Sequence, residues 1–132
     1  MDRRKLLGLA ALAASTAVPA RASSSEGDST STSTYIRFPM VTATILRTGG
    51  RRGVMTVETG VDVADAALHS RAAHSAPRLR AAYNIVVQRA AGAMLPGTAP
   101  NVDRLVTQLQ AATDATLGRP GAKLLIGTVM VV

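Results

Sequence analysis

Residues 122–132 constrain the fold more than any other stretch of this 132-residue chain. From Leu124 onward the run carries no charge, and aliphatic, mostly β-branched side chains dominate it. Such a run favours a buried, pleated strand over a helix. Both alternating sets are apolar: one is Leu125, Val129 and Val131, and the other is Leu124, Ile126, Met130 and Val132. A half-exposed strand would alternate with polar residues, so we expect a central or partner-facing strand covered on both sides.

The start of the chain has the pattern of an export signal. Arg3, Arg4 and Lys5 precede a mildly apolar run, and Ala20-Arg21-Ala22 matches a small-residue cleavage site, with Ala20 and Ala22 as its small residues. The run is shorter than the roughly 18 residues that span a bilayer. The adjacent Arg3 and Arg4 are typical of a twin-arginine signal, although an ordinary secretory signal or an uncleaved anchor has a similar pattern. We assign residues 1–22 to this signal and expect a periplasmic protein, or one held at the inner membrane and facing the periplasm.

Residues 23–34 contain only Ser, Thr, Gly, Asp and Glu. A segment without apolar residues cannot offset the entropy of ordering, so we expect a flexible tether. The folded domain is then residues 35–132. Because the chain has no cysteine, disulfides, thiolate catalysis and cysteine-based metal sites are excluded.

The domain opens with two strand patterns. Residues 35–46 change phase beside Pro39, which indicates an edge, a bulge or a break there. The glycine-rich residues 47–53 follow as a hairpin loop. Residues 54–63 then alternate cleanly, with Met55, Val57, Thr59, Val61 and Val63 on one side.

Helical periodicity follows the second strand. We expect helices over residues 64–73, over 77–94 with Ser75 near the N-cap, and over 102–117 with Asn101 as the cap and Gly118 as the stop. The predicted order is β-β-α-α-α-β. This is an α+β domain in which helices cover one face of a small antiparallel or mixed sheet of about three strands.

Few residues suggest catalysis. The loop at residues 49–53 is glycine-rich, but a strand follows it and no Gly-Lys-Ser/Thr is present, so a hairpin turn explains it better than a phosphate loop. His69 and His74 are five residues apart, which places them on different sides of a helix. Asp65 and His69 could bind a metal only weakly without a third ligand. We expect neither enzyme activity nor a cofactor.

Arginines account for most of the positive charge. Arg47, Arg51 and Arg52 cluster at the expected hairpin, while others follow the helices. Nucleic-acid binding normally adds stacking aromatic residues, and this chain has only two tyrosines and one phenylalanine, so we expect no nucleic-acid partner. Solvated arginines are the simpler interpretation. A functional one is contact with an anionic partner such as an acidic protein, a lipid head group or a wall polymer.

Residues 35–132 resemble the periplasmic domain of the flagellar basal-body-associated FliL family. The resemblance follows the order Tyr-Ile-Arg-Phe-Pro at 35–39, Pro-Arg-Leu-Arg-Ala-Ala at 77–82, Asn-Val-Asp-Arg-Leu-Val-Thr-Gln-Leu-Gln at 101–110 and Leu-Leu-Ile-Gly-Thr-Val-Met-Val-Val at the end. It implies a stomatin-like (SPFH-like) fold and a non-catalytic role in motility and chemotaxis. The implied partners are flagellar motor or stator proteins and further copies of the chain. Members of that family usually carry a transmembrane helix, whereas this chain begins with a short signal.

Two functions from different classes follow from these patterns. The first is a FliL-like periplasmic scaffold, whose subunit or partner face would be formed by Leu124, Ile126, Met130 and Val132. The second is a soluble periplasmic binding module for an anionic ligand, which Arg47, Arg51 and Arg52 would contact.

Overall fold

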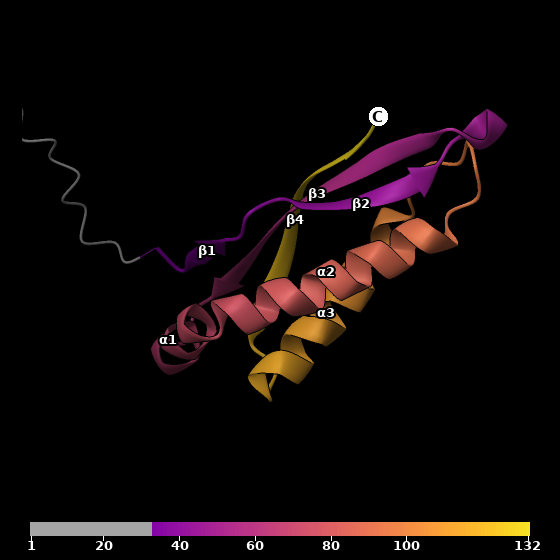
Figure 1. Ribbon diagram of the computed structural model, residues 1–132. Coiled ribbons are helices and arrows are strands. Elements are labelled where there is room, and N and C mark those ends of the chain that lie inside the picture. Colours follow the sequence, from indigo (N-terminus) through magenta and orange to yellow (C-terminus); the bar gives the residue numbers. More distant parts are fainter. Residues whose placement is uncertain (1–32) are drawn as a thin grey trace, which may run out of the picture. The chain divides into compact units, whose positions relative to one another are not determined.

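The strand β3 (Arg52–Val63) holds the sheet together, because each of the other described strands pairs with it. The computed structural model describes residues 33–132, which are drawn in colour in Figure 1. The predicted export signal, including Arg3, Arg4, Ala20 and Ala22, and most of the predicted tether lie outside these residues. The buried side of β3 is formed by Met55, Val57, Thr59, Val61 and Val63, as its alternating sequence predicts.

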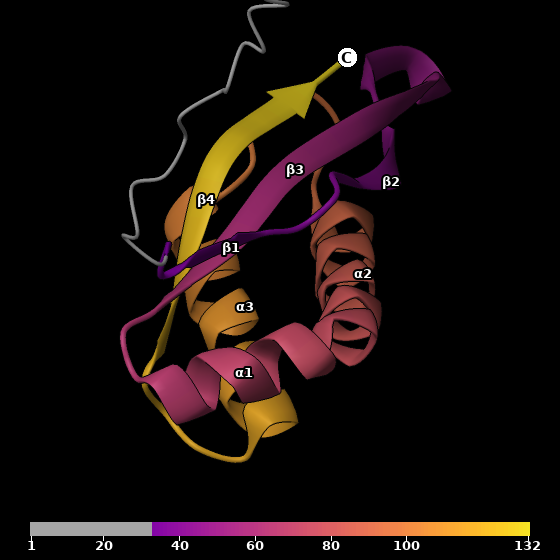
Figure 2. The same ribbon diagram turned by 90° about the vertical axis from the view of Figure 1, so that its left-hand side faces the viewer.

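The sheet is antiparallel throughout. The strands β1 (Tyr35–Arg37) and β2 (Val41–Leu46) pair with successive parts of β3, and β4 (Ala122–Val131) pairs with β3 along nearly its whole length. β4 therefore lies on the opposite side of β3 from β1 and β2 (Figure 2). The expectation of a central final strand is wrong, because β3 occupies the centre and β4 is an edge strand. The predicted α+β class, with helices on one face of the sheet, is confirmed.

A break beside Pro39 divides the first predicted strand into β1 and β2. Before the break, Ile36 and Phe38 face the core. After it, the core-facing residues are Val41, Ala43 and Ile45. A regular strand would have sent one of these sets to the solvent face. The break therefore lets two sets of opposite phase pack on the same core. Beside it, Gly60 of β3 is overlain by the Tyr35 ring, which would clash with a Cβ at residue 60.

Three helices cover one face of the sheet: α1 (Ala66–His74), α2 (Ala76–Ala93) and α3 (Val102–Leu117). The fully buried stripes of α2 and α3 repeat mainly every four residues, which is the spacing of one helical face. Those of α2 are Leu79, Tyr83, Val87 and Ala91, and those of α3 are Leu105, Leu109, Thr113 and Leu117. Both helices lie against the same side of the sheet in Figure 1.

The helix ends have the predicted caps. Asn101 accepts a hydrogen bond from the Arg104 backbone N–H at 3.0 Å, and Gly118 ends α3 in the left-handed conformation with φ 79°. Ser75 occupies the N-cap position of α2, as predicted, although its side chain makes no cap hydrogen bond. It lies at a tight junction, where its backbone N–H donates to the Arg71 carbonyl of α1.

A bulge divides β4 into two parts with different surroundings. Thr59 pairs with Ile126 and Val57 with Val129, so two residues of β4, Gly127 and Thr128, oppose the single Glu58 of β3. An extra residue shifts the alternation of the side chains by one position. The helix face therefore receives Leu124 and Ile126 before the bulge but Val129 and Val131 after it.

Candidate functional site

The four residues expected to form one partner face do not share a face. Leu124 is 3% exposed and belongs to the core, and Ile126 packs against that core. Met130 and Val132 are 49% and 58% exposed on the other side of the sheet. The expectation of one continuous face is therefore wrong. The bulge places Leu124 and Ile126 on the opposite side of the sheet from Met130 and Val132.

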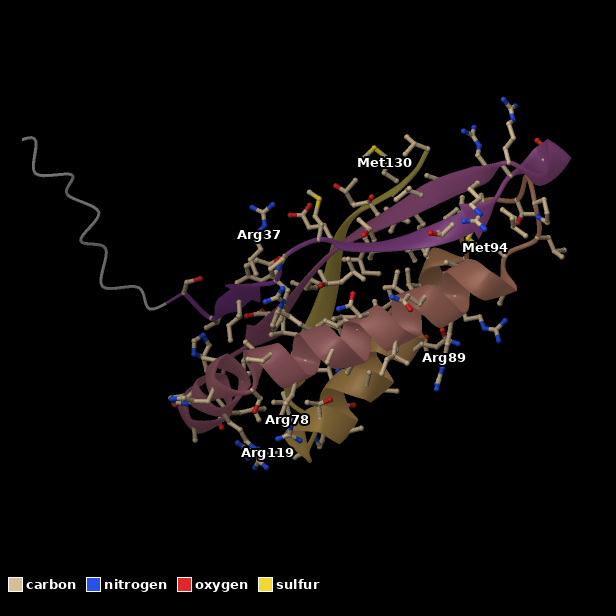
Figure 3. All side chains as sticks on the ribbon, in the orientation of Figure 1. Arg37, Arg78, Arg89, Met94, Arg119 and Met130 are labelled. Carbon is tan, nitrogen blue, oxygen red and sulfur yellow. The ribbon has the colours of Figure 1, made fainter. Side chains whose placement is uncertain are left out.

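The sheet face away from the helices carries an exposed apolar area at its β2–β3–β4 end. We call Leu46, Val54, Met130 and Val132 the outer patch; each is between 41% and 58% exposed. Val54 exchanges two backbone hydrogen bonds with Val132, and Thr56 pairs with Met130, so the patch spans neighbouring strands. Figure 3 shows Met130 on the side of the sheet opposite the labelled helix arginines.

The rest of the same sheet face is charged. Arg37 forms an ion pair with Glu58 at 2.5 Å. Asp62 of β3 and Lys123 of β4 are opposite each other in the strand register. The outer patch is therefore bordered by charges on one side, an arrangement found at protein–protein interfaces, where a polar rim surrounds an apolar centre. Within residues 33–132, the second edge of β4 has no strand partner. Such an edge can hydrogen-bond another chain.

The predicted anionic-contact residues lie at the tip of the β2–β3 hairpin. The backbone N–H of Arg47 donates to the Arg51 carbonyl at 2.7 Å across the turn Thr48–Gly50, and Arg52 opens β3. All three arginines are exposed. The structure thus brings the three together, at a hairpin turn as the sequence predicts.

A cavity of about 400 Å³ lies between the end of α2, the following loop and the start of α3. Its base includes Met55 and Leu105, which are buried, while Arg89 and Arg104 line it from the two helices. None of the described residues that line it is acidic. Figure 3 shows Met94, another lining residue, between α2 and the sheet.

The loop beside this cavity also touches the hairpin tip. The Thr98 hydroxyl and backbone N–H both donate to the Leu95 carbonyl, at 2.6 and 3.2 Å, which closes a turn around Gly97. A Cβ at Gly97 would lie 2.8 Å from the Thr48 methyl group. The cavity and the hairpin arginines therefore lie at the same end of the domain.

Sequence reasoning did not group Arg89 with Arg104. The available signal was the short loop with Pro96, Gly97 and Pro100 between two helical stripes, because a short connection keeps the ends of consecutive helices close. Each arginine also directly precedes a core-facing position of its helix, Ala90 or Leu105.

Two of the residues considered as weak metal ligands, Asp65 and His74, have ordinary structural partners. The Asp65 carboxylate accepts from the Leu68 backbone N–H at 3.0 Å and pairs with Arg119 at 2.6 Å. His74 Nδ1 lies 2.8 Å from the Ser70 carbonyl oxygen. Between Ser33 and Val132, no three histidine or acidic side chains are placed to share a metal ion.

No protein-family model matches the chain, and no curated protein sequence matches it significantly. In the part of the chain that the structure describes, no helix combines the length and the apolar character needed to cross a membrane.

Proposed function

We propose that this protein is a non-catalytic periplasmic accessory protein that binds a protein partner through the outer patch and the neighbouring edge of β4. The observation that carries this proposal is the apolar outer patch on the uncovered sheet face, beside an edge strand. Aliphatic and methionine side chains exposed together are costly in water and are characteristic of interaction surfaces. The resemblance to the FliL family supports the flagellar motor or stator as the place of action, with assembly of several copies as part of the role.

The test combines deletion of the gene with complementation by surface variants. Met130→Lys together with Val132→Lys places two charges in the outer patch without touching the core. Ile85→Lys is the matched control, because Ile85 is 53% exposed but lies on α2. We expect the deletion to reduce spreading in soft agar, the Ile85 variant to restore it and the patch variant to fail although it is present at a normal level. A deletion strain that spreads normally, with the protein absent from flagellar sites, would refute the flagellar role.

A second candidate function is favoured by the distribution of charge. Arg47, Arg51, Arg52, Arg89 and Arg104 lie at the hairpin end, and none forms an ion pair with a described residue. Asp103 precedes Arg104 in the first turn of α3, whereas Glu58 and Asp65 are already paired with other arginines. This positive end suits the alternative role as a binding module for an anionic lipid or wall polymer.

A further inference from the structure

We propose that the cavity between α2 and α3 binds a single-chain amphiphile with an anionic head, such as a medium-chain fatty acid. This binding activity is independent of the partner contact at the outer patch. The cavity has a volume of about 400 Å³, which is near the lower end of the range of about 300–1,000 Å³ for small-molecule sites. A cavity of that size suits one acyl chain better than a two-chain lipid.

The apolar part of the cavity wall is suited to a hydrocarbon chain. Met55 from β3 and Leu105 from α3 form its base, and Ala90 and Met94 form part of the α2 wall. Alanine side chains leave room beside the helix, and methionine is flexible enough to fit around chains of different shape. Burial of each methylene group in such surroundings contributes about 0.8 kcal/mol in transfer experiments.

The polar part of the cavity wall is suited to an anionic head group. Arg89 and Arg104 come from different helices and line the same space, with the polar Gln108 also present. Guanidinium groups donate hydrogen bonds in a fork that matches a carboxylate. Among residues 33–132 no acidic side chain lines the cavity, so no described carboxylate in its wall competes for these donors. Two arginines and an apolar base in the wall of one cavity therefore favour a ligand with both an anionic and an apolar part.

Calorimetric titration of the purified protein with decanoate, below its micelle concentration, tests this proposal. We expect one bound decanoate per chain, binding about tenfold weaker for decanol and no measurable binding of acetate, because the site needs both head and chain. Arg89→Gln together with Arg104→Gln should weaken decanoate binding by about tenfold or more. Arg80→Gln is the matched control, an exposed arginine of α2 that does not line the cavity, and it should bind as the parent does.

A second variant fills the cavity instead of removing charge. Ala93 lines the cavity but is exposed, so Ala93→Trp should fold normally and abolish decanoate binding. Equal binding of decanoate by the parent and by both cavity variants would overturn the proposal. It would also be overturned if decanoate failed to bind while phosphatidylglycerol vesicles did, because the anion would then be recognised at a membrane surface.

Discussion

Tyr83 is a polar residue placed fully inside an apolar core. Its hydroxyl lies 2.7 Å from the Thr113 hydroxyl, which donates to the Leu109 carbonyl at 2.8 Å, so Tyr83 is the donor in the pair. The ring meets Phe38 edge to face, with centroids 5.4 Å apart. One residue thus links α2, α3 and the segment between β1 and β2. Burial raises the pKa of Tyr83 above its ordinary value, and the nearby Asp114 charge adds to this effect against the opposing Thr113 bond.

Replacing Tyr83 by Phe should lower the free energy of unfolding at neutral pH by about 0.5–1.5 kcal/mol, since one buried hydrogen bond is lost. The same replacement should also change how the free energy of unfolding depends on pH in alkaline solution. In the unfolded chain a tyrosine ionises near pH 10, whereas the folded Tyr83 keeps its proton to a higher pH, so the unfolded state loses protons first. Stability therefore falls as pH rises above about 10 in the parent, and this fall should be smaller in the variant.

Urea unfolding between pH 8 and 11 measures both effects. Tyr35→Phe is the control, because Tyr35 is 40% exposed and its hydroxyl lies outside the core, so its removal should change stability little. An alkaline loss of stability as steep in Tyr83→Phe as in the parent would mean that Tyr83 is not its source.

At the scale of a single element, the bulge changes which residues of β4 face the core. Before the bulge Leu124 and Ile126 pack under the helices, and after it Val129 does so while Met130 reaches the other face of the sheet. The edge position explains why the strand can change role along its length, since one neighbouring strand rather than two fixes its register.

Leu124→Ala and Met130→Ala should therefore differ strongly in their effect on stability. Leu124 is 3% exposed, and truncating it leaves a cavity that costs about 2–5 kcal/mol. Met130 is 49% exposed, and its truncation should change the free energy of unfolding by less than about 0.5 kcal/mol. Urea unfolding of the two variants measures the difference. Similar losses in both would place the two side chains in similar surroundings and contradict the bulge.

For the whole domain, charge is unevenly distributed between the hairpin end and the rest. The two described ion pairs join Arg37 to Glu58 and Arg119 to Asp65, and neither includes an arginine of the hairpin tip. Because Arg47, Arg51 and Arg52 form no ion pair with a residue of the described domain, they produce a local positive field that an anionic surface would experience at low salt.

Changing Arg47, Arg51 and Arg52 to Glu should abolish binding to vesicles that contain phosphatidylglycerol. The matched control changes Arg71, Arg78 and Arg80 to Glu, which alters the net charge by the same amount on α1 and α2. Co-sedimentation at rising salt concentrations measures both. We expect parental binding to weaken with salt and the control to retain most of it. Equal losses in the two variants would show that only net charge matters.

The sequence predicts local structure well where each element has one environment. The alternation of residues 54–63, the stripes of α2 and α3, and Asn101 and Gly118 at the ends of α3 are all found as expected. The α+β class follows from these elements and is confirmed.

The errors arise where a strand changes environment along its length. Leu124 and Met130 belong to one alternating set in the sequence, and only pairing with β3 reveals the extra residue at Gly127 and Thr128. The charge-free run also favours a central strand, although exposed aliphatic residues are equally compatible with an uncovered edge. The cavity depends on how α2 and α3 pack, so Arg89 and Arg104 could not be paired from spacing alone.

The dependence of every described strand on β3 has a consequence for local unfolding. β1 and β2 bond to one side of β3 and β4 to the other, so either edge can open without breaking the bonds of the opposite edge. The three-residue β1 should open most readily, and its amides should exchange with solvent hydrogen early. The amides of β3 should exchange last, because exposing them all requires both edges to be released. The edge strands can thus open one at a time while β3 stays in place under the helices.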